Sequence, residues 1–351
     1  TRPWAKAMKQ RVITRQMPPW HIDRTVGVQK FKNDMSLTDE QIATIARWAD
    51  AGAPMGDPKD MPPPKQWPTG NEWKAAKDLG QPDLIIKSDA YTMAARHQDV
   101  WWRPTSDIPL TEARWARAVE IRPGTPQGRK ITHHAVAYLI QDDPESMGPG
   151  GDRDLRGRAM LMEWAIGKGY DLYRTGSGKL LLPGSKITWD VHIHAVGEEI
   201  RDNVELGIWL YPKGQEPEHR TFLTGFQALR GFGTSDSSRL GGGRNMDLAP
   251  NSIGQTDNYT VLKKAAQLEN FQPHMHLRGK AMTVEAILPD GTIQPVSHVG
   301  NFNFNWMTNY IYDDDAAPVF PKGTMIHVTP WYDNTRANPN NPDPDQWVGY
   351  G

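Results

Sequence analysis

The chain has 351 residues, a formal net charge of −1 and a pI near 6.8. This length predicts two or three domains, because a single hydrophobic core stops growing beyond about 250–300 residues. The lack of a basic excess argues against nucleic acid or an anionic membrane as a partner, and no uninterrupted apolar run is long enough to span a bilayer. The sequence shows no signal peptide and begins with Thr1 rather than Met, as a mature secreted protein or a fragment would.

Cysteine is absent from the chain. This excludes disulfides, thiolate metal sites, cysteine nucleophiles and covalently attached c-type haem within the chain. Any metal site must therefore use His, Met, Asp or Glu. The 32 Gly, 29 Pro and 14 Trp residues favour many turns between short strands over a helical bundle.

Residues 1–53 are predicted to form a small helical piece. Apolar residues recur near helical spacing over residues 4–13, and a Pro-Pro pair ends that pattern. A second helix is predicted to begin at Thr38, where Gln41 completes a capping box, and to end near Gly52. This piece is too short to form a robust core alone.

Residues 54–82 are predicted to be a linker, because their prolines favour an extended and semi-rigid path. Beyond the linker, stretches rich in Trp, Val, Ile and Tyr and bounded by Pro or Gly predict strands. A break near residues 211–220 divides these strands into two units, residues 83–214 and residues 215–351.

Glycine marks several predicted turns and loops. Asp290 and Gly291 form a hairpin signal in the second unit. The glycine-rich segment 146–157 predicts an irregular loop. The glycines in "LGGGR" (residues 240–244) lack the strand–turn–helix context of a phosphate site, so we interpret residues 241–243 as another loop.

Six of the eleven histidines fall in three short clusters within strand-like sequence. On a strand, side chains at i and i+2 share a face about 7 Å apart, so a His-x-His pair can converge on one metal ion. Adjacent histidines face opposite ways, and they bind one ion only where the strand bulges or ends. Neutral imidazole is the commonest side-chain ligand for copper, zinc and iron. The alternative is that all three clusters are ordinary core or surface histidines: His133 and His134, His192 and His194, His274 and His276.

The order of these motifs resembles the copper type II, ascorbate-dependent monooxygenases, the family of peptidylglycine α-hydroxylating monooxygenase and dopamine β-monooxygenase. "ITHHAVAY" is similar to its paired-histidine motif, "WDVHIHAVGEEIRDN" to its strand with a third histidine, and "FQPHMHLRGK" to its second copper motif. The resemblance covers about residues 81–351. It implies a mainly β fold with two jelly-roll antiparallel β-sandwich domains in tandem, each of which carries one copper.

The resemblance also implies roles for individual histidines. His133, His134 and His192 would hold an electron-transfer copper, and His274 and His276 would be the catalytic ligands of an oxygen-activating copper. The remaining histidines of interest have no matching motif. We expect His194 to face solvent; the alternatives are an extra metal ligand and a group that contacts a ligand. We expect structural roles for His298 and His327.

One ligand of the family pattern has no counterpart. The family completes its oxygen-activating site with a methionine on a strand well past the His-x-His motif, and no methionine follows Met325. Met325 does not suit the role, because it lies upstream of the "NPNNPDP" loop that precedes that strand in bacterial relatives. We expect the chain to be cut before the methionine strand, so that the ligand lies beyond residue 351; otherwise the protein uses another ligand.

Residues 1–53 have a resemblance of their own, to the C-terminal half of a bacterial c-type cytochrome domain. It is carried by "RPWAKAMKQRVITRQMPPWH" and "LTDEQIATIARWADAGAP". It implies that Met17 is a haem axial ligand if a Cys-x-x-Cys-His motif precedes the chain, since thioether sulfur suits haem iron. Without that motif Met17 is an ordinary buried methionine. We expect both ends of the natural protein to be missing from this sequence.

Together the resemblances imply a periplasmic or extracellular bacterial monooxygenase with two copper ions, which inserts one atom of O2 into a C–H bond of a small-molecule or peptide substrate. Imidazole supports both copper oxidation states, as this chemistry requires. Ascorbate, or a fused or partner cytochrome c, would be the electron donor. Two alternatives stay open: a copper-binding electron-transfer module without hydroxylase activity, and a structural or assembly protein with vestigial sites. The substrate stays open, as does assembly into a homo-oligomer or a larger redox complex.

Overall fold

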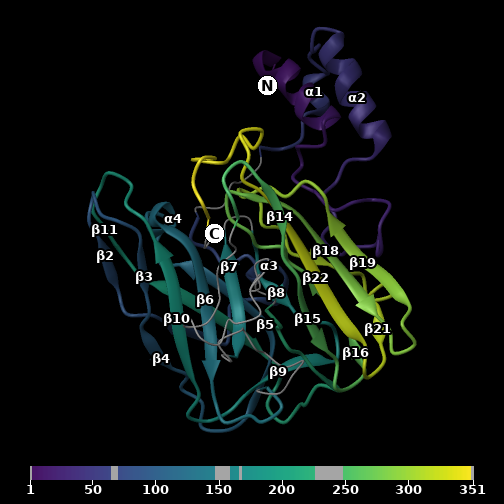
Figure 1. Cartoon of the computed structure of the whole chain (residues 1–351). Coiled ribbons are helices and arrows are strands. Elements are labelled where there is room, and N and C mark those ends of the chain that lie inside the picture. The colour runs from purple at the N-terminus through teal and green to yellow at the C-terminus, as the bar shows by residue number, and fades with distance from the viewer. Residues whose placement is uncertain (1, 65–69, 147–158, 166–167, 226–247, 349–351) are drawn as a thin grey trace.

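The computed structural model describes residues 2–64, 70–146, 159–165, 168–225 and 248–348. Most of its elements are strands, and they form two β units side by side, with two helices near the N-terminus as a separate lobe (Figure 1). The prediction of a mainly β chain with several sheets behind a small helical segment is confirmed. The loops predicted at 146–157 and 241–243 lie, apart from Ser146, outside the described residues.

The N-terminal lobe contains a 3-10 turn (Arg2–Trp4) and the helices α1 (Ala5–Ile13) and α2 (Asp39–Asp50). The predicted capping box of α2 is confirmed. The Gln41 N–H donates to the Thr38 hydroxyl at 3.2 Å, and the Gln41 side chain accepts from the Thr38 N–H at 2.9 Å. The core shared by the two helices is small, with Trp48 packed against three alanines: Ala5, Ala49 and Ala53.

The chain between these helices crosses to the second β unit instead of forming a helix. Ile22 and Phe31 each make an isolated β-bridge with that unit. Trp20 packs edge-on against Tyr310, with ring centroids 4.7 Å apart. The prediction of a separate domain over residues 1–53 is therefore wrong for this segment, because its large apolar side chains are buried in the core of the second unit.

The predicted linker is extended only in its first part. It contains a 3-10 turn (Pro58–Asp60), but Trp73 is buried against Trp209, with ring centroids 6.1 Å apart. The N–H groups of Lys74 and Ala75 donate to the Glu120 carboxylate at 2.9 and 3.0 Å, and the short helix α3 (Ala76–Leu79) follows. The chain from Trp73 onward thus belongs to the first β unit, since an indole of this size stabilises the fold only when it is covered.

The first β unit contains two sheets that enclose one hydrophobic core. One sheet has the order β1-β12-β5-β9-β13, with β8 paired to β5: β1 (Leu84–Lys87), β5 (Arg114–Pro123), β8 (Asp171–Leu172), β9 (Ser177–Leu181), β12 (Val204–Leu210) and β13 (His219–Arg220). The other has the order β3-β10-β6-β7, with β4 paired to β10: β3 (Val100–Trp102), β4 (Thr105–Asp107), β6 (Thr132–Ile140), β7 (Met160–Ala165) and β10 (Lys186–Ile193). A ribbon of β2 (Tyr91–Met93) and β11 (Ile200–Asp202) and the one-turn helix α4 (Gly128–Ile131) complete the unit.

All the described pairings in this unit are antiparallel except that of β13 with β9, which is parallel. Because β13 joins this sheet, the first unit extends past the boundary predicted at residue 214. Within the described ranges, no helix combines the length and the apolar character needed to cross a membrane.

The second unit is built on the sheet β14-β22-β18-β19, with β15 also paired to β22: β14 (Ile253–Gln255), β15 (Asn258–Val261), β18 (Gly279–Ile287), β19 (Ile293–Val299) and β22 (Met325–Asp333). Two short ribbons pack with it: β16 (Ala266–Gln267) with β21 (Val319–Phe320), and β17 (Asn270–Phe271) with β20 (Tyr310–Ile311). The predicted hairpin turn between β18 and β19 is confirmed. Gly291 has φ 86° and donates to the Leu288 carbonyl at 2.9 Å, a backbone conformation that favours glycine.

The two β units share an interface along β7 and the chain that follows it. Ala165, the last residue of β7, is buried in the core of the second unit. Nearby, Lys168 and Asp171 form a buried ion pair at 3.1 Å, and Asn309 of the second unit donates to Asp171 at 3.2 Å. This interface determines where the histidines of the two units lie relative to each other.

Candidate metal centre

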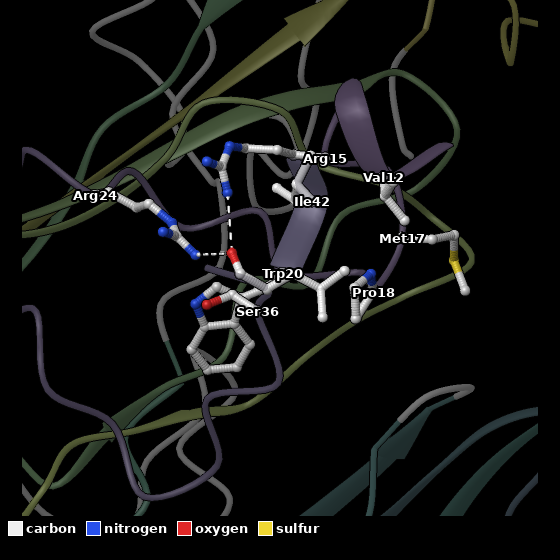
Figure 2. A pocket seen from close by; sticks show the side chains of 9 residues that line it. Val12, Arg15, Met17, Pro18, Trp20, Arg24, Ser36 and Ile42 are labelled. Atoms are coloured by element: carbon white, nitrogen blue, oxygen red, sulfur yellow. Dashed lines mark hydrogen bonds between the residues drawn. The ribbon is translucent and has the colours of Figure 1, made fainter. Parts of the chain in front are cut away.

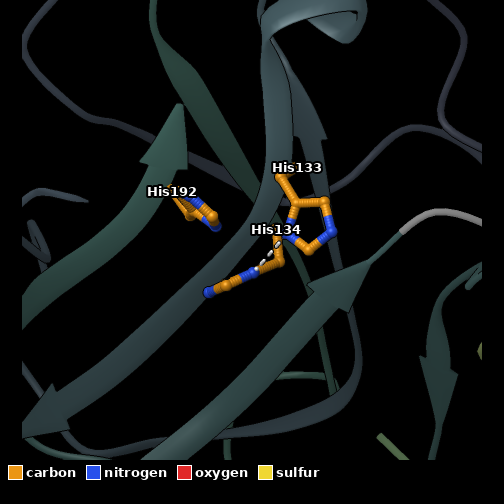
Figure 3. Close-up of side chains that lie close together, drawn as sticks. All are labelled: His133, His134 and His192. Atoms are coloured by element: carbon orange, nitrogen blue, oxygen red, sulfur yellow. Dashed lines mark hydrogen bonds between the residues drawn. The ribbon is translucent and has the colours of Figure 1, made fainter. Parts of the chain in front are cut away.

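The first histidine group lies where β6 begins and β10 ends. His134 pairs with His192 across the ladder, and the register then shifts so that Thr132 pairs with Ile193. His133 is therefore the extra residue of a β-bulge. The bulge provides what the sequence pattern required, because it lets two adjacent imidazoles lie on one side of the strand. Figure 3 shows the ring of His192 pointing toward the rings of His133 and His134.

The three rings of this group are in close contact. The ring centroid of His192 lies 5.0 Å from that of His133 and 5.1 Å from that of His134. The Nδ1 atoms of His133 and His134 are 2.9 Å apart. One nitrogen from each of the three rings falls within 4.8 Å of the others, a spacing at which a single ion could be bound.

The second histidine pair lies in a loop, not on a strand. His274 and His276 fall between β17 and β18, and the strand predicted for them is wrong. Pro273 has no N–H to donate to a ladder, which disfavours strand pairing at this point. The two histidines nevertheless lie close together, as expected for side chains at i and i+2, and their rings are 5.4 Å apart. Met275 between them is 3% exposed and packs in the core of the second unit.

His134 brings the two sets of histidines into one continuous cluster. Its ring lies 5.6 Å from that of His274 and 6.4 Å from that of His276, and these three residues form a second possible metal-binding group. The sequence led us to expect two separate centres, one in each unit. The structure instead places all five histidines together, with His134 common to both groups.

The surroundings keep His133 and His134 neutral. Burial, followed by the charges of His192, His274 and His194, lowers the pKa of His133 to about 4. Burial also lowers the pKa of His134 well below its ordinary value. Imidazoles that stay unprotonated retain the lone pair that a metal ion needs.

Two carboxylates contact this cluster from outside. Asp99 Oδ2 lies 2.7 Å from His192 Nε2, and Glu163 Oε1 lies 3.2 Å from His274 Nδ1. Burial alone would raise the pKa of Glu163, but the contact with the His274 ring and the charge of that ring outweigh burial and lower the pKa of Glu163 to about 2. The other ring nitrogen of His192, Nδ1, is buried without a hydrogen-bond partner in the described part of the chain. A buried lone pair directed at two other imidazoles fits a bound metal ion.

Aromatic side chains cover two of the rings. Trp101 stacks on His192, with centroids 4.4 Å apart and planes at 7°. Phe304, from the second unit, stacks on His133 at 5.2 Å and 17°. Sequence analysis missed Trp101, Phe304 and both carboxylates. No motif identifies them, because each contacts a histidine that is distant in the sequence or belongs to another strand.

The histidines that were not assigned to copper lie outside both groups. His194 follows β10 and donates its N–H to the Ile131 carbonyl at 2.9 Å, and its charge contributes to the lowered pKa of His133. His298 contacts the Thr283 hydroxyl at 2.7 Å. His327 contacts Asp257 at 3.0 Å through Nε2 and Glu285 at 3.4 Å through Nδ1. These contacts are of the structural kind expected for His298 and His327.

Met325 lies far from the histidine cluster. It pairs with Ile287 at one end of β18, whereas His276 precedes Gly279 at the other end. At about 3.4 Å per residue the two ends of β18 are about 25 Å apart. This placement agrees with the sequence argument that Met325 does not supply the missing ligand.

Met17 lies at the edge of a small pocket in the N-terminal lobe. Figure 2 shows its sulfur pointing away from Arg15 and Arg24, both of which donate to the Leu37 carbonyl at 3.4 Å. Its side chain is exposed (42% for the residue), so it is not the buried methionine of the alternative interpretation. The residues present do not fit a covalently bound haem, because the chain has no cysteine.

Comparison with known proteins adds little to this picture. No family model matches the sequence, and no curated protein matches it. Among solved structures, a crystal structure of a two-domain protein of unknown function from Bacteroides fragilis is similar over 82% of this chain and 100% of its own. The two sequences are 9% identical and the TM-score is 0.16, so no functional argument follows.

Proposed function

We propose that this protein is a copper-dependent monooxygenase that hydroxylates a substrate C–H bond with O2, with electrons from ascorbate or a cytochrome. One observation carries the proposal: five imidazoles from two β units, each with its own hydrophobic core, converge in one cluster. Copper bound there would supply one-electron redox chemistry and a place for O2 to react. Imidazole is a suitable ligand for both oxidation states of copper.

The chain's own residues would prepare the site in three ways. Burial keeps His133 and His134 unprotonated, as their lowered pKa values indicate. The bulge at His133 directs adjacent rings to the same side of β6. Trp101 and Phe304 cover the faces of His192 and His133, which restricts ring rotation and shields the rings from water.

The common position of His134 favours a second candidate function. If one ion takes His133, His134 and His192, the second group retains only His274 and His276 of its three histidines. A chain that binds a single copper ion in this way would act as an electron-transfer module without hydroxylase activity. The number of ions bound therefore separates the two functions.

The test is copper titration of the purified chain, followed by metal analysis after removal of free ion. Two ions per chain support the monooxygenase, and one ion supports the electron-transfer module. A chain that binds none would have to be a structural or assembly protein. Turnover is then assayed with ascorbate and 18O2 against a panel of peptides, aromatic amines and hydrocarbons, where one 18O atom per product molecule is expected.

His276→Ala should abolish 18O incorporation while copper stays bound to His133, His134 and His192. His327→Ala is the matched control, because His327 is also a partly buried histidine of the second unit but lies outside the cluster. Full turnover by His276→Ala would contradict the assignment of the second group as the reactive one.

A further inference from the structure

A strap of residues 20–33 connects the N-terminal lobe to the second β unit. Ile22 makes a β-bridge with Val299 near one end of the strap, and Phe31 makes a β-bridge with Tyr312 near the other. Three backbone N–H groups of the strap donate to carbonyl groups of the second unit at 2.7, 2.9 and 2.9 Å, those of Asp23, Val28 and Lys32. The strap is therefore held to the second unit by backbone hydrogen bonds along its length.

The middle of the strap lies directly on β19. Gly27 has φ 65°, and a Cβ atom at this position would lie 2.0 Å from the Val296 carbonyl oxygen. The Val28 N–H donates to this same oxygen. A position that combines a positive φ with no room for a side chain requires glycine. The strap thus has one defined position on the second unit, and its large apolar side chains are packed in the core below.

His21 is the buried titratable residue of the strap. It is 8% exposed, and its neighbours Trp20 and Ile22 are packed in the core of the second unit. Its backbone N–H donates to the Tyr310 hydroxyl at 3.2 Å. Nε2 of its ring is buried and has no hydrogen-bond partner among the described residues. A neutral ring can occupy this position, but a protonated ring would bury a charge and an unbonded N–H donor there.

The charged groups around His21 do not offset such a charge. In the described part of the chain no carboxylate is bonded to Nε2 of this ring, and burial is the cause of the lowered pKa of His21. The titratable groups of the strap, β19 and β20 have other partners: Asp23 accepts from Thr25, Arg24 donates to the Leu37 carbonyl, Lys30 and Lys32 pair with Asp315 and Asp314, His298 contacts Thr283, and Tyr310 accepts from the His21 N–H.

We propose that His21 is a pH-sensitive switch that keeps the strap docked on the second unit while its ring is neutral and releases the strap when its ring is protonated. This inference goes beyond the proposed function, because it does not depend on copper. Release uncovers Trp20, Ile22 and Phe31 and frees the N-terminal lobe to move relative to the second unit.

The direction of the pH effect follows from the two states of the ring. In the released strap the ring is in water and has the ordinary histidine pKa of about 6.5, whereas burial lowers the pKa of His21 in the docked strap. At a pH between these two values the released strap binds more protons, so acid favours release. The contribution of His21 to docking is complete above about pH 6.5 and is lost as the pH falls toward the pKa of the docked ring.

Hydrogen exchange of the metal-free full chain, measured from about pH 7.5 to about pH 5, tests the switch. The quantity compared is the protection factor, because the intrinsic exchange rate itself depends on pH. For the N–H groups of Asp23, Val28 and Lys32 we expect it to fall by up to about tenfold per pH unit below about pH 6.5, while β18 and β22 keep their protection. Protection of the strap that does not change with pH would overturn the inference, as would an equal fall throughout both β units.

Two variants assign the effect to the His21 ring. His21→Phe retains a ring and His21→Gln retains a polar group, and neither can be protonated in this pH range. Both should keep the strap equally protected at the two ends of the range. His219→Gln is the matched control, since the His219 side chain on β13 is 68% exposed, and this variant should show the wild-type pH dependence. A strap that still opens in acid in either folded His21 variant would contradict the role of His21. If neither variant folds, the wild-type exchange pattern decides.

Discussion

The two histidine groups are built on different kinds of backbone. The first group lies on two paired strands, with His133 and His134 on β6 and His192 near the end of β10. β10 pairs with β6 over residues 186–193, and the ladder is regular except for one bulge. His274 and His276 lie in an unpaired loop between short strands. The first group is thus oriented by backbone hydrogen bonds within one unit, while the second is oriented by side chains from the neighbouring unit.

This contrast shows how a site can depend on a domain interface. The ladder places the first group without help from the second unit. The second group, by contrast, includes His134 of the first unit, and its His274 contacts Glu163 of the first unit. We therefore expect changes at the interface to affect the second group more than the first, and the following predictions test this difference.

His134→Ala should have the largest effect, because His134 is the one histidine common to both groups. We expect loss of tight copper binding at both, measured as ions bound per chain after dialysis. His133→Ala should impair only the first group, and His298→Ala, outside the cluster, should bind as wild type. Two ions retained by His134→Ala would show that the groups are independent.

Asp171→Asn should destabilise the chain by about 3–5 kcal/mol, because it leaves the Lys168 ammonium buried without its charged partner. Denaturant unfolding of the apo chain measures this loss. Asp107→Asn is the control, since it breaks an exposed pair with Lys186 that contributes little. Equal stability of the two variants would show that the ion pair at the interface does not hold the units together.

Trp101→Ala should have a smaller effect, confined to the first group. Removal of a stacked ring costs about 0.5–1.5 kcal/mol, which corresponds to roughly 2- to 10-fold in copper affinity. Chelator competition measures the change, and Trp306→Ala, which removes a similarly exposed indole from the second unit, is the control. A larger loss of copper affinity for Trp306→Ala than for Trp101→Ala would contradict the role given to the Trp101 ring.

Met325→Leu should leave copper binding unchanged, because Met325 is at the end of β18 remote from His276. X-ray absorption of the reduced copper-loaded chain provides a direct check for a sulfur ligand. A Cu–S contribution that disappears in Met325→Leu would contradict the placement of this strand and identify the missing ligand.

Local sequence was sufficient to predict the elements whose signals act over a few residues. The capping box at Thr38 and Gln41 and the turn at Gly291 formed as predicted, because each depends on hydrogen bonds or φ angles of neighbouring residues. Stretches rich in Trp, Val, Ile and Tyr and bounded by Pro or Gly likewise predicted a mainly β chain. The predictions that failed concern packing. Trp20 and Trp73 are buried against strands far along the sequence, so the residues near them belong to the two β units and not to the helical piece and the linker that were predicted.

For the metal centre, the sequence by itself determined which imidazoles are available and that His133 and His134 would need a bulge to act together. Only the tertiary structure decided that the five rings form one cluster with His134 in common, that the His-x-His pair lies in a loop, and that Asp99 and Glu163 contact two of the rings. The physical reason is that ligand types and strand periodicity are local properties of the chain. The meeting of Glu163 with His274 instead depends on how two separately cored units pack, and no short pattern encodes that packing.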